Sequence, residues 1–195
     1  MFAAGVPLVE ALGIGAQVIA NRVIRGEVLV AAQKTGVKTT DEFIKLAKAN
    51  PGRYSYGSSG VGTALHLAGE MVKEQSGLFM THIPYRGVAP LTNDLLGNNI
   101  EFGVFVLSSG LPHIRAGKVV ALGTTEKKRS QVTPDIPALA EHPALKNTDI
   151  SSWFVLMGPG KLPEPVVAKL KKALAEALQS PDLRKKLEAS GSSIA

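Results

Sequence analysis

Residues 54–66 read Tyr54-Ser-Tyr-Gly-Ser-Ser-Gly-Val-Gly-Thr-Ala-Leu-His66 and place small residues between an expected strand and an expected helix. A turn of glycines and hydroxyl residues at such a junction presents unpaired backbone N–H groups at a helix N-terminus, where the helix dipole favours an anion. Ser58, Ser59 and Thr63 add hydroxyl donors, and the glycines permit close approach of the backbone. The stretch predicts a tight turn with two alternative roles. It either binds a carboxylate or phosphate, or it uses small residues only so that the strand and the helix can pack closely.

The segments around this stretch alternate between strand and helix patterns. Thr39 with Glu42 three residues later is a capping-box pattern, which predicts the start of a short helix that ends before Pro51. The expected strands cover 27–32, 54–57, 81–84, 100–107, 118–124 and 150–158. Further helices are expected over 64–76, 89–96 and 110–116, with two more from 164 and 181 onward. The alternation predicts an α/β fold with a largely parallel sheet, preceded by a helix over 9–23.

The composition limits the classes of protein that the chain can represent. Its 195 residues, 45% of them apolar and 19% charged, describe an ordinary globular protein. The absence of cysteine excludes disulfides, thiol catalysis and thiolate metal sites. No signal peptide is visible, and the longest apolar run is too short to span a bilayer. The net charge of +6 comes mainly from runs on polar helix faces without aromatic partners, so we expect no nucleic-acid binding.

The sequence lacks the motifs of cofactor and metal sites. The dinucleotide-binding pattern and the P-loop are both absent, so we expect no cofactor. The four histidines have no metal-ligand spacing, so we expect no metal; they are His66, His82, His113 and His142. The nucleophile elbow G-x-S-x-G is also missing, and we expect no catalytic residue. An α/β hydrolase-like enzyme that uses Ser58 or Ser59 stays open as the less favoured alternative, because triads assemble from distant positions.

A second informative run is His82-Ile-Pro-Tyr-Arg-Gly-Val-Ala-Pro90. Its Arg86 is suited to bind a carboxylate through two parallel hydrogen bonds, and the residues after it lead into another helix N-terminus. An exposed arginine in an ordinary turn is the alternative interpretation.

Six runs in this order closely resemble the substrate-binding receptors of tripartite tricarboxylate transporters, known as the Bug family. The two runs quoted above are followed by Asp94-Leu-Leu-Gly97, Leu111-Pro-His-Ile-Arg-Ala-Gly-Lys118, Thr133-Pro-Asp-Ile-Pro137 and Ser151-Ser-Trp-Phe154. The resemblance covers about residues 27–191 and implies a periplasmic binding protein of type II, with two Rossmann-like lobes hinged together. Such a receptor closes over a small carboxylate, of the di- or tricarboxylate type, and delivers it to the membrane components of the transporter without chemistry.

The resemblance also implies where the lobes and the ligand lie. Residues 1–32 would be a remnant of the first lobe with a hinge strand, 33–122 the second lobe, and 123–195 the return segment of the first lobe. Family members hold a ligand carboxylate through backbone groups and ordered waters between the lobes. The corresponding positions here are Ser58, Ser59, Gly60 and Thr63, with the turn at Arg86, Gly87 and Ala89 close by.

Three departures from the family pattern limit this transfer. Residues 1–26 do not resemble the N-terminal strand and glycine-rich loop of the family, and the chain ends at Ala195 where family members usually continue. Phe105 stands where many members place an aspartate in the cleft, which favours a plain carboxylate over an amino acid. An incomplete first lobe would expose sheet edges and apolar surface. The alternative function is therefore a truncated, non-binding lobe that acts as an interaction module and forms a homo-oligomer to cover that surface.

Overall fold

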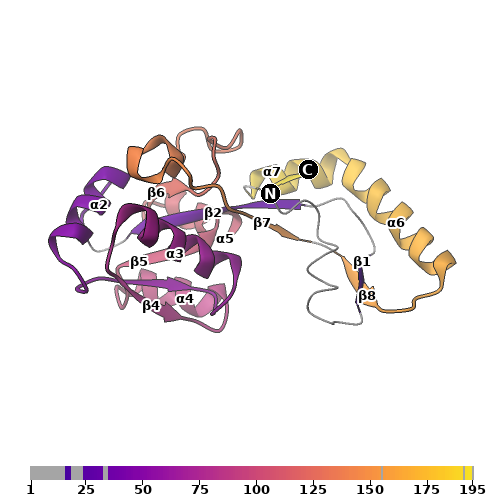
Figure 1. Ribbon diagram of the computed structural model, residues 1–195. Helices are drawn as coiled ribbons and strands as arrows, with labels where there is room; N and C mark the ends of the chain where they lie inside the picture. Colours follow the sequence, from indigo (N-terminus) through magenta and orange to yellow (C-terminus); the bar gives the residue numbers. More distant parts are fainter. Residues whose placement is uncertain (1–15, 19–23, 33–34, 155, 191, 195) are drawn as a thin grey trace. The chain divides into compact units, whose positions relative to one another are not determined.

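The computed structural model describes residues 16–18, 24–32, 35–154, 156–190 and 192–194. The chain divides into two compact units, which are residues 26–152 and, together, residues 1–25 and 153–195. We call the first the sheet unit and the second the terminal unit (Figure 1). The glycine-rich turn at 58–63, which we call the anion loop, belongs to the sheet unit. The lobe limits implied by the family resemblance stay a prediction.

Five strands of the sheet unit pair in the order β4-β3-β5-β2-β6. Their bounds are Ile24–Ala32 for β2, Ser55–Ser58 for β3, Thr81–Pro84 for β4, Phe102–Val106 for β5 and Val120–Thr124 for β6. Strand β3 runs parallel to β4 and β5, whereas β2 runs antiparallel to β5 and β6. The predicted α/β class is confirmed, but the sheet is mixed rather than largely parallel. Local residue patterns could not show this, because the direction of a strand is defined only against its neighbours.

Four helices cover the two faces of this sheet (Figure 1). They are α2 (Thr40–Ala49), α3 (Ala64–Ser76), α4 (Val88–Leu96) and α5 (Leu107–Arg115). One hydrophobic cluster joins residues of α2 and α3 to Phe102 and Val104 of β5, and a second joins residues of α4 and α5 to Phe105. Successive side chains of a strand point to opposite faces, so α2 and α3 lie on one face and α4 and α5 on the other.

Phe105 lies in the hydrophobic core rather than at a surface. Its side chain is only 2% exposed, and its ring lies against Gly103, where an added Cβ would be 2.5 Å from a ring carbon. The sequence-based inference about a missing aspartate placed this position in the ligand cleft. Because β5 turns the Phe105 side chain into the second cluster, the residue type here gives no information about the ligand.

Several element limits differ from the sequence predictions. Helix α5 begins at Leu107, three residues before the expected start, with Val106 at its N-cap. The strand expected over 150–158 is split into β7 (Ser151–Phe154) and β8 (Met157–Pro159). Strand β1 (Ala16–Val18) lies within the helix expected over 9–23, and the rest of that expected helix lies outside the described residues. Strand β1 forms because it pairs antiparallel with β8, a distant partner that a local pattern does not reveal.

The remaining elements agree with the sequence pattern, except strand β9 at the end of the chain, which was not predicted. The irregular stretch expected over 133–143 contains the 3₁₀ helix η1 (Leu139–Glu141), with η2 (Pro143–Leu145) at its end. In the terminal unit, α6 (Glu164–Gln179) and α7 (Pro181–Ala189) begin where proline and acidic residues predict helix starts, and β9 (Ser192–Ile194) follows. None of the helices in the described part of the chain has both the length and the apolar character needed to cross a membrane.

Candidate functional site

The candidate site lies where the parallel strands β3 and β4 end. Their registers align Ser58 with Pro84, so the turn into α3 and the turn into α4 begin side by side. Two backbone hydrogen bonds join the turns, from the Tyr85 N–H to the Ser58 carbonyl at 2.9 Å and from the Gly87 N–H to the Ser59 carbonyl at 3.2 Å. The two runs that the sequence singled out are therefore in direct contact. Ligand crevices in α/β proteins form at this carboxyl end of the strands.

The anion loop has a backbone conformation that requires glycine at two positions. Gly60 and Gly62 have φ angles of 139° and 78°, which residues with a side chain rarely adopt. Thr63 then caps α3: its Oγ1 accepts a hydrogen bond from the His66 N–H at 3.3 Å and donates one to the Gly60 carbonyl at 2.8 Å. The first N–H groups of a helix have no backbone partner within the helix. At the start of α3 the Thr63 hydroxyl takes the N–H of His66, and the N–H groups of Ala64 and Leu65 are left to meet an anion.

The predicted hydroxyl groups of the loop are not equivalent. Ser58 is fully buried, at 0% exposure, and its Oγ lies 2.7 Å from His82 Nε2 and 3.3 Å from both the N and the O of Gly60. Ser59 is partly exposed, and its Oγ donates to Thr63 Oγ1 at 3.4 Å. The Ser58 hydroxyl thus holds the loop together, whereas Ser59, Gly60 and Thr63 are partly exposed.

The second turn brings an arginine and a further helix start to the same place. Gly87 has a φ angle of 106° and stands at the N-cap of α4, which receives no side-chain cap. Arg86 and Ala89 are exposed on either side of it. In the described part of the chain, no carboxylate pairs with the Arg86 guanidinium. All seven residues proposed from the resemblance therefore lie at two adjoining strand-to-helix junctions, from the end of β3 to Thr63 and from Arg86 into the first turn of α4.

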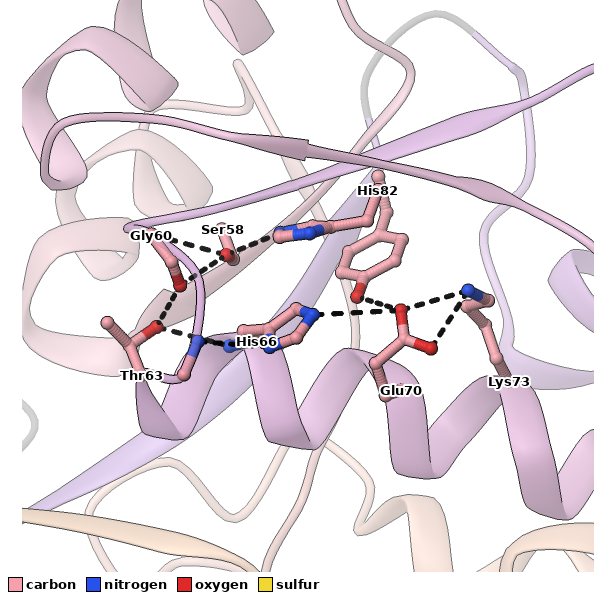
Figure 2. A network of polar contacts seen from close by, with 9 residues as sticks. Ser58, Gly60, Thr63, His66, Glu70, Lys73 and His82 are labelled. Carbon is pink, nitrogen blue, oxygen red and sulfur yellow. Dashed lines mark hydrogen bonds and ion pairs between the residues drawn. The ribbon is translucent and has the colours of Figure 1, made fainter.

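A network of polar and aromatic side chains stands beside the anion loop (Figure 2). Tyr56 of β3 donates to Glu70 Oε1 at 2.6 Å, and Lys73 Nζ lies 2.9 and 3.0 Å from the two Glu70 oxygens. The His82 ring stacks on Tyr56 with 4.9 Å between ring centroids and meets the His66 ring at 4.2 Å. Figure 2 shows the two histidine rings between the loop and the Glu70–Lys73 pair.

Sequence reasoning missed this network because it tested the histidines only for metal-ligand spacing. The spacing along α3 was an available signal. His66 and Glu70 are one helical turn apart, so they share a face of α3, and Lys73 follows Glu70 at the next favourable spacing. Tyr56 and His82 occupy matching positions on neighbouring parallel strands, but that register is visible only in the fold.

The contacts within the network raise the pKa of some of its members and lower the pKa of others. Partial burial opposes the charge of Glu70, but the hydrogen bonds from Tyr56 and Lys73 outweigh it and lower the pKa of this carboxyl. Burial, reinforced by the hydrogen bond to Glu70, raises the pKa of the Tyr56 phenol. Burial also lowers the pKa of His82, and the neighbouring His66 adds to that effect. Glu70 is therefore the fixed negative charge of the network, facing Lys73 and, across 4.0 Å, the Nε2 of His66.

The family of the chain is decided by a match over nearly its whole length. The family model described as "Tripartite tricarboxylate transporter family receptor" matches residues 15–194. The chain belongs to this receptor family. The family named from the sequence resemblance is thereby confirmed.

Curated relatives agree with this assignment. The chain is 35% identical over 154 residues to a UPF0065 protein of Bordetella pertussis and 32% identical over 155 residues to BugT of the same organism. These matches cover 79% and 78% of this chain and 47% of each relative, so the chain spans about half the length of such receptors. One further match is short: a stretch of 30 residues, 15% of the chain, is 77% identical to a segment that makes up 7% of the type II secretion system protein F of Pseudomonas aeruginosa.

Solved structures of receptors share the fold. A protein described as a periplasmic transporter superimposes with a TM-score of 0.85 at 34% identity, covering 92% of this chain and 60% of that one. The periplasmic binding protein BugD gives 0.86 at 29% identity, with 92% and 60% covered. An R. palustris protein solved with adipate gives 0.88 at 26% identity, with 93% and 60% covered. The predicted fold family, that of periplasmic binding proteins, is confirmed.

The receptors of this family are solute-binding proteins rather than enzymes, and the burial of Ser58 in this chain agrees with that. Ser58 and His82 have the 2.7 Å separation of a nucleophile and its base. A nucleophile must touch its substrate, however, and the Ser58 side chain is inaccessible and bonded to the Gly60 backbone. The described residues contain no group of three or more potential metal ligands. The contact between Ser58 and His82 is structural.

Proposed function

We propose that this chain binds a small di- or tricarboxylate at the anion loop and the adjoining Arg86 turn, as part of the receptor of a tripartite tricarboxylate transporter. One observation carries the proposal: two helices begin side by side at the carboxyl ends of adjacent parallel strands, in a chain of this receptor family. The converging N–H groups provide fixed dipoles that stabilise an anion without a buried counter-charge.

The residues of the two turns have separate roles in this proposal. One carboxylate meets the partly exposed surface of Ser59, Gly60 and Thr63. The Ser59 hydroxyl turns to it from its 3.4 Å contact with Thr63 Oγ1, the backbone N–H groups at the start of α3 face it, and the buried Ser58 keeps the loop in shape. Gly87 and Ala89 present the start of α4, and the exposed Arg86 guanidinium binds a carboxylate oxygen pair. The R. palustris protein solved with adipate and MatC of Rhodopseudomonas palustris with bound malate support a dicarboxylate as the first ligand to test.

The partner and the compartment follow from the family and belong to the same proposal. A receptor of this class works in the periplasm and delivers its ligand to the membrane components of the transporter. It needs lobe closure and no chemistry. Solved relatives described as periplasmic support this location.

Thermal unfolding of the full chain with malate, adipate and citrate tests the proposal. A ligand present at about 100 times its Kd is expected to stabilise the fold by about 2.7 kcal/mol. Arg86→Gln should weaken binding of that ligand by about ten- to a hundredfold, because a hydrogen bond to a charged group contributes about 1.5–3 kcal/mol.

Arg53→Gln is the matched control, because Arg53 is an exposed arginine that precedes β3, at the opposite end of the strand from the loop. It should bind like the unmodified chain. No response to any of the three carboxylates at millimolar concentration would remove the proposed function. A stable homo-oligomer without such a response would instead support the interaction-module alternative.

A further inference from the structure

His66 contacts the backbone of the anion loop directly. The ring Nδ1 of His66 accepts a hydrogen bond from the Gly62 N–H at 3.2 Å. The backbone N–H of His66 donates to the Thr63 hydroxyl at 3.3 Å (Figure 2). A ring nitrogen accepts a hydrogen bond only when it carries no proton. The observed loop therefore requires a neutral His66 with its proton on Nε2, the nitrogen that faces Glu70.

We propose that His66 is a positioning residue of the carboxylate site: its unprotonated Nδ1 holds Gly62 in place, and protonation of the ring releases the anion loop. The link to ligand affinity rests on the proposed function, whereas the link between ring and loop does not. Histidine is the side chain whose charge ordinarily changes between pH 5 and 8, so the loop would respond to the acidity of its surroundings.

The neighbouring histidine is not equivalent in this respect. His82 Nε2 meets the Ser58 hydroxyl, which is both a donor and an acceptor. When the ring is neutral with an unprotonated Nε2, the hydroxyl donates to it; when Nε2 carries a proton, the hydroxyl accepts and turns its own hydrogen to the Gly60 carbonyl. The hydrogen bond between His82 and the loop therefore persists whether or not Nε2 carries a proton. The contact between His66 and Gly62 does not, because a backbone N–H cannot accept.

Two effects of protonating His66 oppose each other at the site. The titratable groups that contact this ring are the Glu70 carboxylate on α3 and the His82 ring on β4, which is charged when protonated. Lys73 of α3 and the Tyr56 phenol of β3 reach the ring only through Glu70, to which both are bonded. An imidazolium attracts an anion, but Glu70 lies 4.0 Å from Nε2 and offsets most of that charge. Loss of the Gly62 hydrogen bond removes the shape that lets the loop bind. We therefore expect acid to weaken carboxylate binding.

Paired variants separate this role from simple packing. His66→Asn places an amide oxygen near the position of Nδ1, keeps the acceptor and does not titrate, whereas His66→Leu fills the space without an acceptor. Histidine and asparagine have similar helix propensities, so α3 should be little affected by the first change. The first measurement follows the Gly62 amide and the His66 ring nitrogens of the ligand-free full chain by ¹⁵N NMR between pH 8 and 5.

The expected spectra show an unprotonated Nδ1 at high pH and a Gly62 amide signal that titrates together with the His66 ring. In His66→Asn that signal should stay constant with pH. Two results would overturn the inference whether or not any carboxylate binds. One is a Gly62 amide signal in the unmodified chain that does not change when the His66 ring gains a proton, and the other is a neutral ring with its proton on Nδ1.

The second measurement compares affinities for malate, or for whichever carboxylate stabilises the chain, across the same pH range. Relative to His66→Asn, which cancels the titration of the ligand itself, the unmodified chain should lose affinity on acidification, approaching about tenfold per pH unit. His66→Leu should bind at least about tenfold more weakly at pH 8, and His66→Asn should restore most of that loss. Parallel pH profiles for the unmodified chain and His66→Asn would overturn the coupling to ligand. If no carboxylate binds while Gly62 still follows the ring, the proposed function fails and the loop contact stands.

Discussion

Replacing Phe102 by alanine is expected to lower the free energy of unfolding by about 3–5 kcal/mol, the range for removing a large aromatic ring from a packed core. Phe102 is 1% exposed, and its ring centroid lies 4.7 Å from that of Phe43 and 5.9 Å from that of Tyr54. It stands on β5, which pairs with both β2 and β3. The cavity would open next to strands that cannot close it without breaking their register. Urea unfolding followed by circular dichroism measures the loss.

Phe79→Ala is the matched control for this substitution. Phe79 is 70% exposed and follows α3, so its loss should change the free energy of unfolding by no more than about 0.5 kcal/mol. A comparable loss in both variants would contradict the packing of the sheet unit described above. Because the anion loop leaves the sheet at the end of β3, Phe102→Ala should also weaken any carboxylate binding.

The sequence predicted the elements of the sheet unit well because their signals are local. The capping pattern at Thr39, the glycine after α3 and the turn before Thr63 each define an end of an element within a few residues. The direction of β2 and the split between β7 and β8 were not predictable in this way. Each depends on a partner strand far along the chain, which leaves no trace in the local pattern.

The same distinction between local signals and long-range strand pairing decides how much of the candidate site could be predicted. Ser59, Gly60 and Thr63 could be proposed from the sequence because a glycine- and hydroxyl-rich turn is itself a local pattern, and their contact with a ligand stays a prediction. Two other features were not found, namely the burial of Ser58 and its contact with His82, because both depend on the register between β3 and β4. The local pattern thus predicts the residues proposed to meet an anion, and only the fold shows which side chains keep the loop in shape.

Thr63 is the residue whose substitution should affect the anion loop most directly. Its hydroxyl is the N-cap of α3 and also donates to the Gly60 carbonyl, so one group joins the middle of the loop to the first turn of the helix. Thr63→Val keeps the shape of the side chain but removes both hydrogen bonds. We expect a loss of about 1–2 kcal/mol in the free energy of unfolding and at least about a tenfold loss of carboxylate affinity. Thr63→Ser retains the hydroxyl and should preserve both properties.

Thr39→Val separates the two effects, because Thr39 caps α2 in the same manner, accepting from the Glu42 N–H at 3.2 Å, but belongs to no predicted site. It should lower the free energy of unfolding by a similar amount, measured by urea unfolding, and leave the affinity for malate or adipate unchanged, measured by calorimetry. Equal losses of affinity in Thr63→Val and Thr39→Val would mean that the ligand responds only to overall stability. A loss confined to Thr63→Val ties the ligand to the start of α3 and the loop before it, because Thr39→Val uncaps a helix of the same unit without removing a hydrogen bond of that loop.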